Sequence, residues 1–377
     1  MNTNGKRNGP DSQANGKLLY IPMDSDHKRK RIKVVMRKKN SITIADIAKK
    51  AGVSRTTVSF YLNRKFEKMS SKTRDKIESV IEETEFVPNV LARSLNNKQS
   101  YLIGVLLHSL DSKEKAGFLE GVEDCLKENN YQMIVALSGW DLDEERRQIE
   151  KMKALGVDGF IVSPSDSFDL LWNTLKSPSP LVVYNPSHVS PYRYWVRTND
   201  YEAVYDALDQ AVDAGYKRFI LVSEEPGKHG TIAQRCRAFD SVTRLRHRAA
   251  TALYVADPDD TTSLEYRLVQ QIRIDEPTCF FVTTPALLRA VYLVLRRYRE
   301  LMPESIGLIG INALEWAEMV DPPVTTIVQP AYEAGFHAAR LLLDGILEQN
   351  KELPCRIFPC RLHALGSTRN VKNKKEE

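Results

Sequence analysis

The hydrophobic positions of the chain change their spacing at about residue 100. Beyond that point, short continuous apolar runs alternate with longer amphipathic stretches such as GFLEGVEDCLKEN and DEERRQIEKMKAL. Continuous apolar runs are typical of strands buried on both faces of a parallel sheet, and the stretches between them have helical periodicity. We expect strands at 101–107, 132–137, 159–163, 181–184, 218–223, 252–256, 278–283 and 307–312.

These strands fall into two series, each about the size of one domain. We therefore expect an α/β fold in which residues 99–377 form two doubly wound lobes with parallel sheets. Ligands of open α/β sheets bind at the carboxyl ends of the strands. A cleft between the two lobes is consequently the expected binding place.

Residues 41–87 have a different pattern, which predicts three short helices. Thr43 can cap the first helix, and Asp46 stands where its side chain can reach back to that cap. Gly52 follows at a sharp turn, where a positive φ costs little only for glycine. Ser54 then caps a second helix. The segment is thus expected to be a separate all-α head.

Two short helices joined by a turn that contains glycine form a helix-turn-helix, whose second helix can enter the major groove of DNA. Arg55, Thr56 and Thr57 stand at the start of that second helix. Arginine suits guanine, and threonine suits several base edges or a phosphate. A helical hairpin inside an all-α domain is the alternative, since short patterns of this kind also occur by chance.

The charge of the chain is divided unevenly. Residues 1–100 carry 22 Lys/Arg and 10 Asp/Glu, a net +12, which leaves −7 for the remainder of a chain whose total is +5. A basic front on an acidic body favours a polyanion as partner of the front. Residues 1–40 are rich in Asn, Gly and Lys and lack periodicity, so we expect a disordered basic extension.

Several classes of protein lack support in the sequence. No apolar run has the length of a membrane span, and no stretch near the start resembles a signal peptide. The five cysteines have no metal-ligand spacing, and there is no phosphate-binding glycine loop or G-x-S-x-G elbow. We expect a cytoplasmic protein with reduced thiols and no contact with membrane. It is expected to be no enzyme and to hold no metal or cofactor.

The segment TIADIAKKAGVSRTTVSFYLN, continued by MSSKTRDKIESVIEETEFVPNVLARSLNNKQSYLIGVL, resembles the head of the lactose-repressor (LacI) family of bacterial transcription regulators. The similarity is dense from 41 to about 107 and looser to about 366, through GVDGFIVSPSD, GLIGIN and PPVTTIVQP. It implies a head joined to a two-lobed body like that of periplasmic binding proteins. It also implies a homodimer on a roughly palindromic double-stranded operator.

The same resemblance implies which residues touch DNA. Arg55 and Thr56 match the pair that reads bases at the start of the recognition helix. Residues 88–98 match the hinge helix, and Leu95 matches a leucine that wedges into the minor groove and kinks the duplex. The expected DNA contacts are Thr43, Ser54, Arg55, Thr56, Thr57, Ser59, Phe60, Asn63, Asn89, Ala92, Arg93 and Leu95.

One position departs from the family. Phe60 stands where many members have an arginine that touches DNA, and an aromatic ring cannot form a bidentate contact with guanine. Two explanations of this phenylalanine are open. Either the operator differs at that base, or Phe60 packs into the head and Arg64 contacts a phosphate.

The resemblance of the body implies an effector site with altered residues. The family's Gly-aromatic-Asp signature is here Gly310-Ile311-Asn312, and the ligand-gripping arginine is retained as Arg235. An isolated polar residue at a strand end is also commonly a turn or cap residue. The expected effector contacts are His108, Asn185, Arg197, Arg235, Thr284 and Asn312.

The chain is accordingly expected to be a sequence-specific regulator, a repressor of a carbohydrate-utilisation operon. Its expected effector is a small carbohydrate-derived molecule. Asn185 and Asn312 replace acids that are frequent in the family, so a cleft poor in carboxylates is expected to favour a sugar acid or sugar phosphate. The alternative is a regulator of the same fold gated by a partner protein, or without any small-molecule effector.

Overall fold

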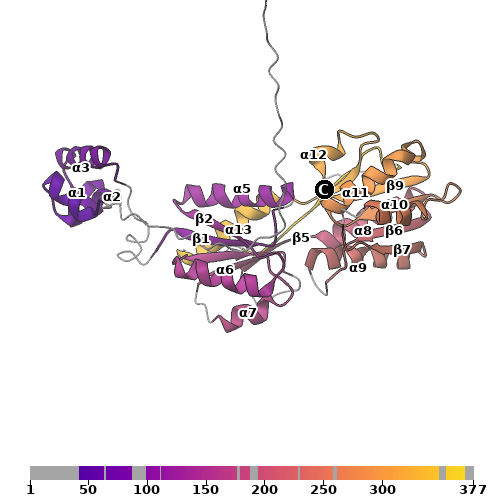
Figure 1. Ribbon diagram of the computed structural model, residues 1–377, viewed down its shortest axis with the longest axis horizontal. Coiled ribbons are helices and arrows are strands. Elements are labelled where there is room, and N and C mark those ends of the chain that lie inside the picture. Colours follow the sequence, from indigo (N-terminus) through magenta and orange to yellow (C-terminus); the bar gives the residue numbers. More distant parts are fainter. Residues whose placement is uncertain are drawn as a thin grey trace, which may run out of the picture. The chain divides into compact units, whose positions relative to one another are not determined.

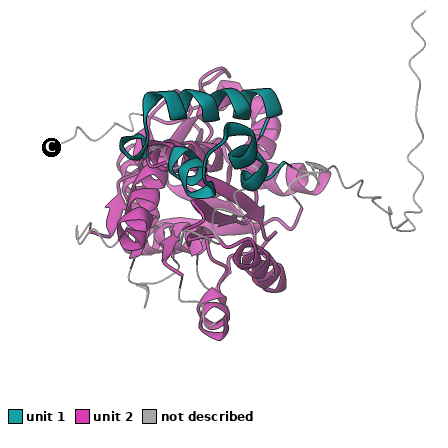
Figure 2. Cartoon of the chain, turned by 90° about the vertical axis from the view of Figure 1, so that its left-hand side faces the viewer, with its two compact units in different colours: residues 1–88 teal, residues 89–377 magenta. Residues whose placement is uncertain are grey.

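A computed structural model describes residues 42–62, 65–86, 99–110, 112–175, 179–186, 194–227, 230–257, 261–347 and 354–369. The expected basic extension at 1–40 and the expected hinge helix at 88–98 lie outside these residues. The chain divides into two compact units, residues 1–88 and 89–377 (Figure 2).

The first unit contains α1 (Ile44–Ala51), α2 (Arg55–Leu62), the 3-10 helix η1 (Phe66–Lys68) and α3 (Ser71–Thr84). The predicted cap of α1 is confirmed, because Thr43 and Asp46 form a reciprocal capping box. Gly52 ends α1 with a φ of 68°, the left-handed conformation that the turn requires. Ser54 Oγ accepts from the main-chain N–H of Thr57 at 3.0 Å, as expected of a cap.

The core of this unit is small and comes from all three α-helices. Ile47, Val58 and Ile77 are fully buried at its centre. Tyr61, Leu62 and several other apolar side chains pack around them. The two helices α1 and α2 are therefore held in one fixed arrangement, with the opposite side of α2 directed outward.

The second unit consists of two lobes, each with a six-stranded sheet (Figure 1). The first sheet has the order β11-β5-β4-β3-β1-β2, and all of its neighbours are parallel. Helices α5 (Lys113–Glu128) and α13 (Ala331–Ile346) cover one face, and α6 (Leu142–Ala154) and α7 (Phe168–Thr174) cover the other. The strands are β1 (Leu102–Leu107), β2 (Gln132–Leu137), β3 (Gly159–Val162), β4 (Leu181–Tyr184), β5 (Tyr194–Thr198) and β11 (Arg356–Phe358).

The sheet of the second lobe has the order β12-β10-β9-β8-β6-β7, with only β12 antiparallel to its neighbour. Helices α8 (Asp200–Asp213) and α9 (Gly230–Leu245) cover one face. Helices α10 (Thr261–Val269), α11 (Pro285–Leu295) and α12 (Leu314–Ala317) cover the other, and η2 (Arg296–Leu301) follows α11. The strands are β6 (Arg218–Ser223), β7 (Ala249–Tyr254), β8 (Thr278–Val282), β9 (Ile306–Ile311), β10 (Thr325–Val328) and β12 (Arg361–His363).

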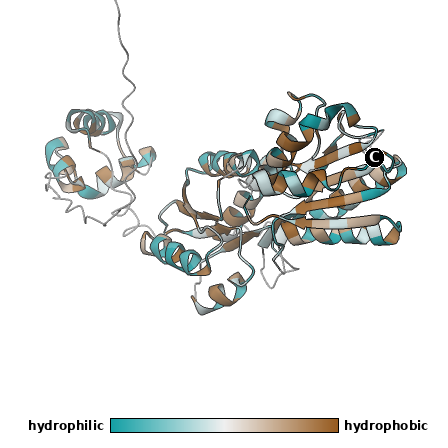
Figure 3. Cartoon of the chain, turned by 45° about the vertical axis from the view of Figure 1, so that its right-hand side comes forward, coloured by the Kyte–Doolittle hydropathy of each residue, from teal (hydrophilic) through white to brown (hydrophobic). Residues whose placement is uncertain are grey.

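Hydrophobic residues concentrate in the strands of both lobes, between helices whose outer faces are polar (Figure 3). The predicted two-lobed α/β architecture is confirmed. Strand β7 begins three residues earlier than expected, and β5, β10, β11 and β12 were not predicted. Within the described part of the chain, no helix has the length and apolar character needed to span a membrane.

The chain passes between the lobes three times: after β5, after β10 and between β11 and β12. These crossovers lie at 198–200, 329–330 and 359–360. They bring the carboxyl ends of strands from both sheets to one junction. A binding site at that junction can contact both lobes at once.

Candidate functional site

The outward side of α2 carries the predicted base-reading residues. Arg55 and Thr56 are exposed, whereas Val58 is fully buried against the other helices. Thr43, Ser54 and Thr57 lie nearby, and their side chains take part in the two helix caps. If these hydroxyl groups contact DNA, they do so while they also cap the first turns of α1 and α2.

Other predicted DNA contacts have different positions. Ser59 and Phe60 are half-buried on α2, and Phe60 is not part of the hydrophobic core of the first unit. The ammonium group of Lys68 lies 5.0 Å from the centroid of the Phe60 ring. The structure thus argues against packing of Phe60 into the core. Asn63, Asn89, Ala92, Arg93 and Leu95, like Arg64, lie outside the described residues.

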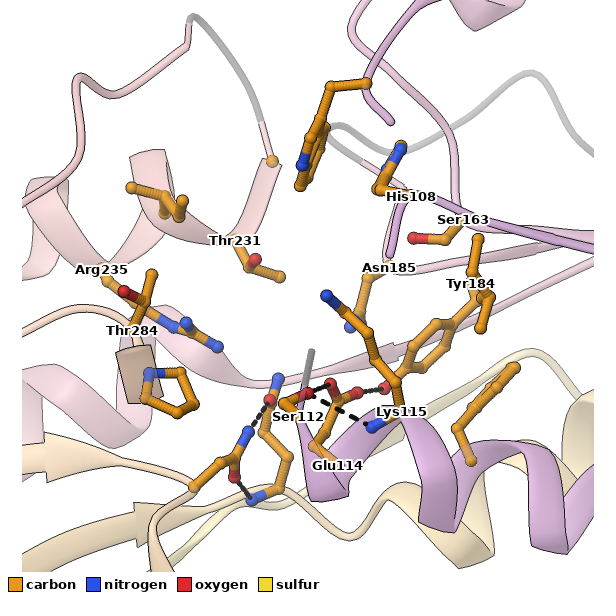
Figure 4. A pocket seen from close by; sticks show the side chains of 18 of the residues that line it. His108, Ser112, Glu114, Lys115, Ser163, Tyr184, Asn185, Thr231, Arg235 and Thr284 are labelled. Atoms are coloured by element: carbon orange, nitrogen blue, oxygen red, sulfur yellow. Dashed lines mark hydrogen bonds between the residues drawn. The ribbon is translucent and has the colours of Figure 1, made fainter. Parts of the chain in front are cut away.

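A pocket lies at the junction of the two lobes of the body (Figure 4). His108, Ser163 and Asn185 follow the carboxyl ends of β1, β3 and β4, and Thr284 and Asn312 follow those of β8 and β9. The first turns of α5 and α9 complete the wall. Five of the six predicted effector residues line this pocket: His108, Asn185, Arg235, Thr284 and Asn312.

Arg197 is the exception. It lies on β5, half-buried, with its guanidinium carbon 5.8 Å from the centroid of the Trp195 ring, and it is not part of the pocket wall. The expectation that Arg197 faces the cleft is therefore wrong. Its strand pairs with β11 at the far edge of the sheet, which separates it from the ends of the central strands.

Arg235 is buried and already has partners. Its Nε and Nη2 donate to Oδ1 of Asp200 at 2.8 and 2.6 Å, and its Nη1 donates to the carbonyl oxygen of Thr283 at 2.7 Å. A guanidinium has five N–H groups, so two of them have no partner in these contacts. The guanidinium of Arg235 is consequently held in place, and its two remaining N–H groups can donate to a ligand.

Asn185 and Asn312 both have left-handed backbones, with φ of 50° and 48°. Their side chains hold the crossovers. Oδ1 of Asn185 accepts from the main-chain N–H of Thr198 at 2.8 Å. Oδ1 of Asn312 accepts from the main-chain N–H of Gln329 at 2.9 Å. These two asparagines line the pocket, but Oδ1 of Asn185 and both polar side-chain atoms of Asn312 bond to residues of the crossovers.

Burial raises the pKa of Glu114, although the hydroxyl of Tyr184 donates to its Oε1 at 2.9 Å. Of the described residues in the wall, Glu114 and Glu224 carry carboxyl groups, and Glu224 accepts from Thr284 Oγ1 at 3.3 Å. Lys115 adds a cation next to Glu114 (Figure 4). Among the described residues of the wall, Glu114 and Glu224 thus lie together with two cations, Lys115 and Arg235, while Asn185 and Asn312 carry no charge.

His108 forms a fixed part of the wall. Its Nδ1 lies 3.2 Å from Ser138 Oγ, and its ring stacks on Trp140 with a centroid distance of 3.5 Å. Burial lowers the pKa of His108 to about 4, and the charge of Lys115 acts in the same direction. The imidazole is thus neutral at pH 7, so it acts as a hydrogen-bonding and stacking group and adds no charge to the pocket.

Sequence analysis did not identify Glu114, Lys115, Trp140, Glu224 or Gln329 as pocket residues. Glu224 directly follows the strand expected at 218–223, so its position carried the same signal as that of His108, whereas Gln329 follows a strand that had not been predicted. Trp140 is 60% exposed and lines the pocket, with its ring stacked on that of His108. In the described residues, no group of three or more His, Cys, Asp or Glu could hold a metal ion.

Family models match a segment in each of the two units. Residues 43–89 match the lacI family of bacterial regulatory proteins, and residues 208–368 match a periplasmic binding protein-like domain. The probable transcriptional regulator EndR of Paenibacillus polymyxa is 27% identical over 315 residues, which cover 82% of this chain and 92% of EndR. Catabolite control protein A of Priestia megaterium is 28% identical over 336 residues, which cover 87% of this chain and all of that protein.

Solved structures show the same fold. The lac repressor dimer bound to operator and the anti-inducer ONPF aligns with a TM-score of 0.75 at 19% identity, over 87% of this chain and 99% of the repressor chain. A lacI-family regulator of Enterococcus faecium with bound ribose aligns with a TM-score of 0.59 at 26% identity. That alignment covers 72% of this chain and 100% of the other. These relatives are transcriptional regulators and not enzymes.

Proposed function

The chain belongs to the lacI family of bacterial regulatory proteins, and on that premise we propose that it represses a carbohydrate-utilisation operon as a homodimer. A small carbohydrate-derived ligand gates the binding of operator DNA. The observation that carries the proposal is the pocket at the lobe junction. Its wall combines groups from both lobes of a body that is joined to a capped helix-turn-helix with Arg55 and Thr56 exposed.

The pocket suits a polyhydroxylated molecule. Glu114 and Glu224 offer acceptors for hydroxyl groups, and Arg235 and Lys115 offer donors. The exposed indole of Trp140 adds an apolar surface against which a sugar ring can stack. The described part of the wall offers both carboxyl groups and cations, so a neutral sugar is a candidate ligand beside a sugar acid or sugar phosphate.

Gating follows from the position of the pocket. Glu114 and Lys115 belong to the first lobe, and Glu224 and Arg235 belong to the second. A ligand that contacts both pairs stabilises one relative orientation of the lobes. It can shift the equilibrium only by its difference in affinity for the two orientations. The proposal therefore predicts that ligand affinity and operator affinity depend on each other reciprocally.

The DNA-binding half is tested by selection of the full-length protein against a pool of randomised duplexes. Arg55→Ala should lose about 1–3 kcal/mol of discrimination at one base pair in each half-site. Lys68→Ala, which removes an exposed cation near α2, should weaken binding to all duplexes alike and flatten the salt dependence. An unchanged base preference in Arg55→Ala contradicts the assignment of α2 as the recognition helix.

The effector half is tested by thermal denaturation against neutral sugars, each paired with its acid and its phosphate. A ligand at one hundred times its dissociation constant should add about 2.7 kcal/mol to the stability of the folded state. A sugar that stabilises the protein should also change its affinity for the operator. Trp140→Ala should weaken the binding of that sugar. A protein that binds operator but no member of the panel would instead support the alternative of a partner protein or no effector.

A further inference from the structure

We propose that Phe60 reads the 5-methyl group of a thymine in each half-site of the operator. This inference rests on the proposed binding of DNA by α2. The side chain of Phe60 has no hydrogen-bonding group, so the base that it recognises must offer an apolar surface.

Phe60 lies on the side of α2 that faces away from the core. Val58 and Leu62 lie two residues before and after it, and both pack in the core of the first unit. A residue two positions from each along a helix points to the opposite side. Phe60 shares that outward side with Thr56, which precedes it by four residues and is exposed.

The ring has no role in the core that explains it. Tyr61, the next residue, packs against the core cluster and lies edge-on to Phe66 with centroids 5.8 Å apart. Phe60 is not in that cluster and is only half-buried. Among the described residues, Lys68 lies beside it, with its ammonium 5.0 Å from the ring centroid. Lys68 is exposed, so the pair forms an apolar ring flanked by a cation on the outward face of the helix.

This combination fits the edge of a thymine next to the backbone. In the major groove the thymine methyl is the apolar feature that distinguishes base pairs, and phenylalanine is among the side chains that contact it. The adjacent ammonium of Lys68 suits the phosphate on the rim of the groove. A bidentate contact to guanine is excluded at this position, because the phenyl ring has neither donor nor acceptor.

The experiment uses the full-length protein and the duplex that it enriches from the randomised pool. Each thymine of that duplex is replaced in turn by deoxyuridine, which removes only the 5-methyl group. Burial of one such group corresponds to about fourfold in affinity, since a methyl-sized group contributes about 0.8 kcal/mol. We expect one thymine in each half-site to show this loss, and about fifteenfold when both are replaced.

Variants connect that loss to Phe60. In Phe60→Ala the deoxyuridine penalty should disappear, while Thr56→Ala, one turn away on the same face, should retain it. In Phe60→Arg a new selection should replace thymine by guanine at the same position, because arginine recognises guanine O6 and N7. Phe60 lies outside the core, so the melting temperature of the variants should match that of the wild type and exclude misfolding.

The possible failures are distinguishable. If the wild type enriches no sequence, the proposed function itself is wrong. If it enriches an operator in which no deoxyuridine substitution weakens binding, only the inference about Phe60 is overturned. The same holds if the penalty persists in Phe60→Ala.

Discussion

Asn312 and Gln329 hold each other through two hydrogen bonds at the lobe junction. The main-chain N–H of Gln329 donates to Asn312 Oδ1 at 2.9 Å, and Asn312 Nδ2 donates to Gln329 Oε1 at 2.5 Å. Gln329 Nε2 then donates to Thr198 Oγ1 at 2.9 Å and to Asp200 Oδ2 at 3.0 Å. One glutamine thus joins a residue of the pocket wall to two crossovers of the chain.

We expect Asn312→Ala to destabilise the body by about 1–3 kcal/mol, because it leaves two polar groups of Gln329 buried without partners. Urea denaturation of the full chain measures the change. A double-mutant cycle with Gln329→Ala should give a coupling energy of about 0.5–3 kcal/mol, as for residues in one hydrogen-bond network. Additive effects of the two substitutions would show that the pair is not a unit.

The ion pair between Arg235 and Asp200 gives a second prediction. Both side chains are buried, so removal of one partner leaves an uncompensated charge. Arg235→Ala should cost about 3–5 kcal/mol of stability, and the Arg235→Ala, Asp200→Ala double variant should cost less than the sum of its parts. The matched control is Arg237→Ala, two residues further along α9 and exposed, which should change stability by no more than about 0.5 kcal/mol.

This prediction also affects how ligand binding is tested. Loss of affinity in Arg235→Ala could follow from a displaced Asp200 and need not mean a lost ligand contact. Comparison of the single variant with the double variant separates the two causes, because the double variant removes the buried charge as well. If Arg235 touches the ligand, affinity stays low in both.

The parts of the fold that depend on neighbouring residues were predictable from the sequence. The caps at Thr43 and Ser54 and the left-handed turn at Gly52 are fixed by side chains within about four residues. The central strands were visible because they are continuous apolar runs. Strand β5 has the sequence YWVRT, in which only three apolar residues precede two polar ones, and it lies toward the sheet edge, so it carries no comparable signal.

The pocket was predictable only in part. Parallel strands end at one edge, so residues such as His108 and Thr284 could be placed together from their position after strands. The pairing of Arg235 with Asp200 joins residues 35 positions apart, which no local pattern reveals. Asn185 and Asn312 were placed at the pocket, yet their hydrogen bonds to the crossovers depend on tertiary contacts.

The neutral imidazole of His108 predicts a dependence of stability on pH. Its pKa is lowered from 6.5 to about 4 in the folded state. Below about pH 6.5 the unfolded chain therefore binds a proton that the folded chain does not, and stability falls as the pH decreases toward 4. The loss attributable to this group is about 3 kcal/mol by pH 4.

His108→Phe tests this contribution, because it retains an aromatic ring against Trp140 and removes the titrating group. Melting temperatures measured between pH 7.5 and 4.5 should fall less steeply for His108→Phe than for the wild type. His247→Asn is the control, since His247 is exposed and its left-handed backbone suits asparagine. Parallel curves for the wild type and His108→Phe would contradict the prediction. Glu145, whose pKa is raised by burial, has its Oε1 3.9 Å from His108 Nδ1, so the difference between the two curves includes the effect of the substitution on this neighbour.

The last prediction concerns the packing of α5 against α13. This packing positions α5, whose first turn lies in the pocket wall. A Cβ atom on Gly121 would lie 2.0 Å from the carbonyl oxygen of Tyr332, and one on Gly335 would lie 2.1 Å from that of Phe118. Both neighbours are backbone atoms, so the helices must separate to admit a methyl group. Overpacking of this kind costs about 1–3 kcal/mol, and occasionally more.

We therefore expect Gly121→Ala and Gly335→Ala to lower the melting temperature of the body. Gly117→Ala is the matched control in the same helix, because its nearest neighbour would be 3.9 Å away, and it should gain up to about 1 kcal/mol from helix propensity. Since Glu114 and Lys115 stand on the first turn of α5, the two harmful variants should also weaken ligand binding while Gly117→Ala leaves it unchanged. Equal stability of all three variants would show that the two helices can separate without cost.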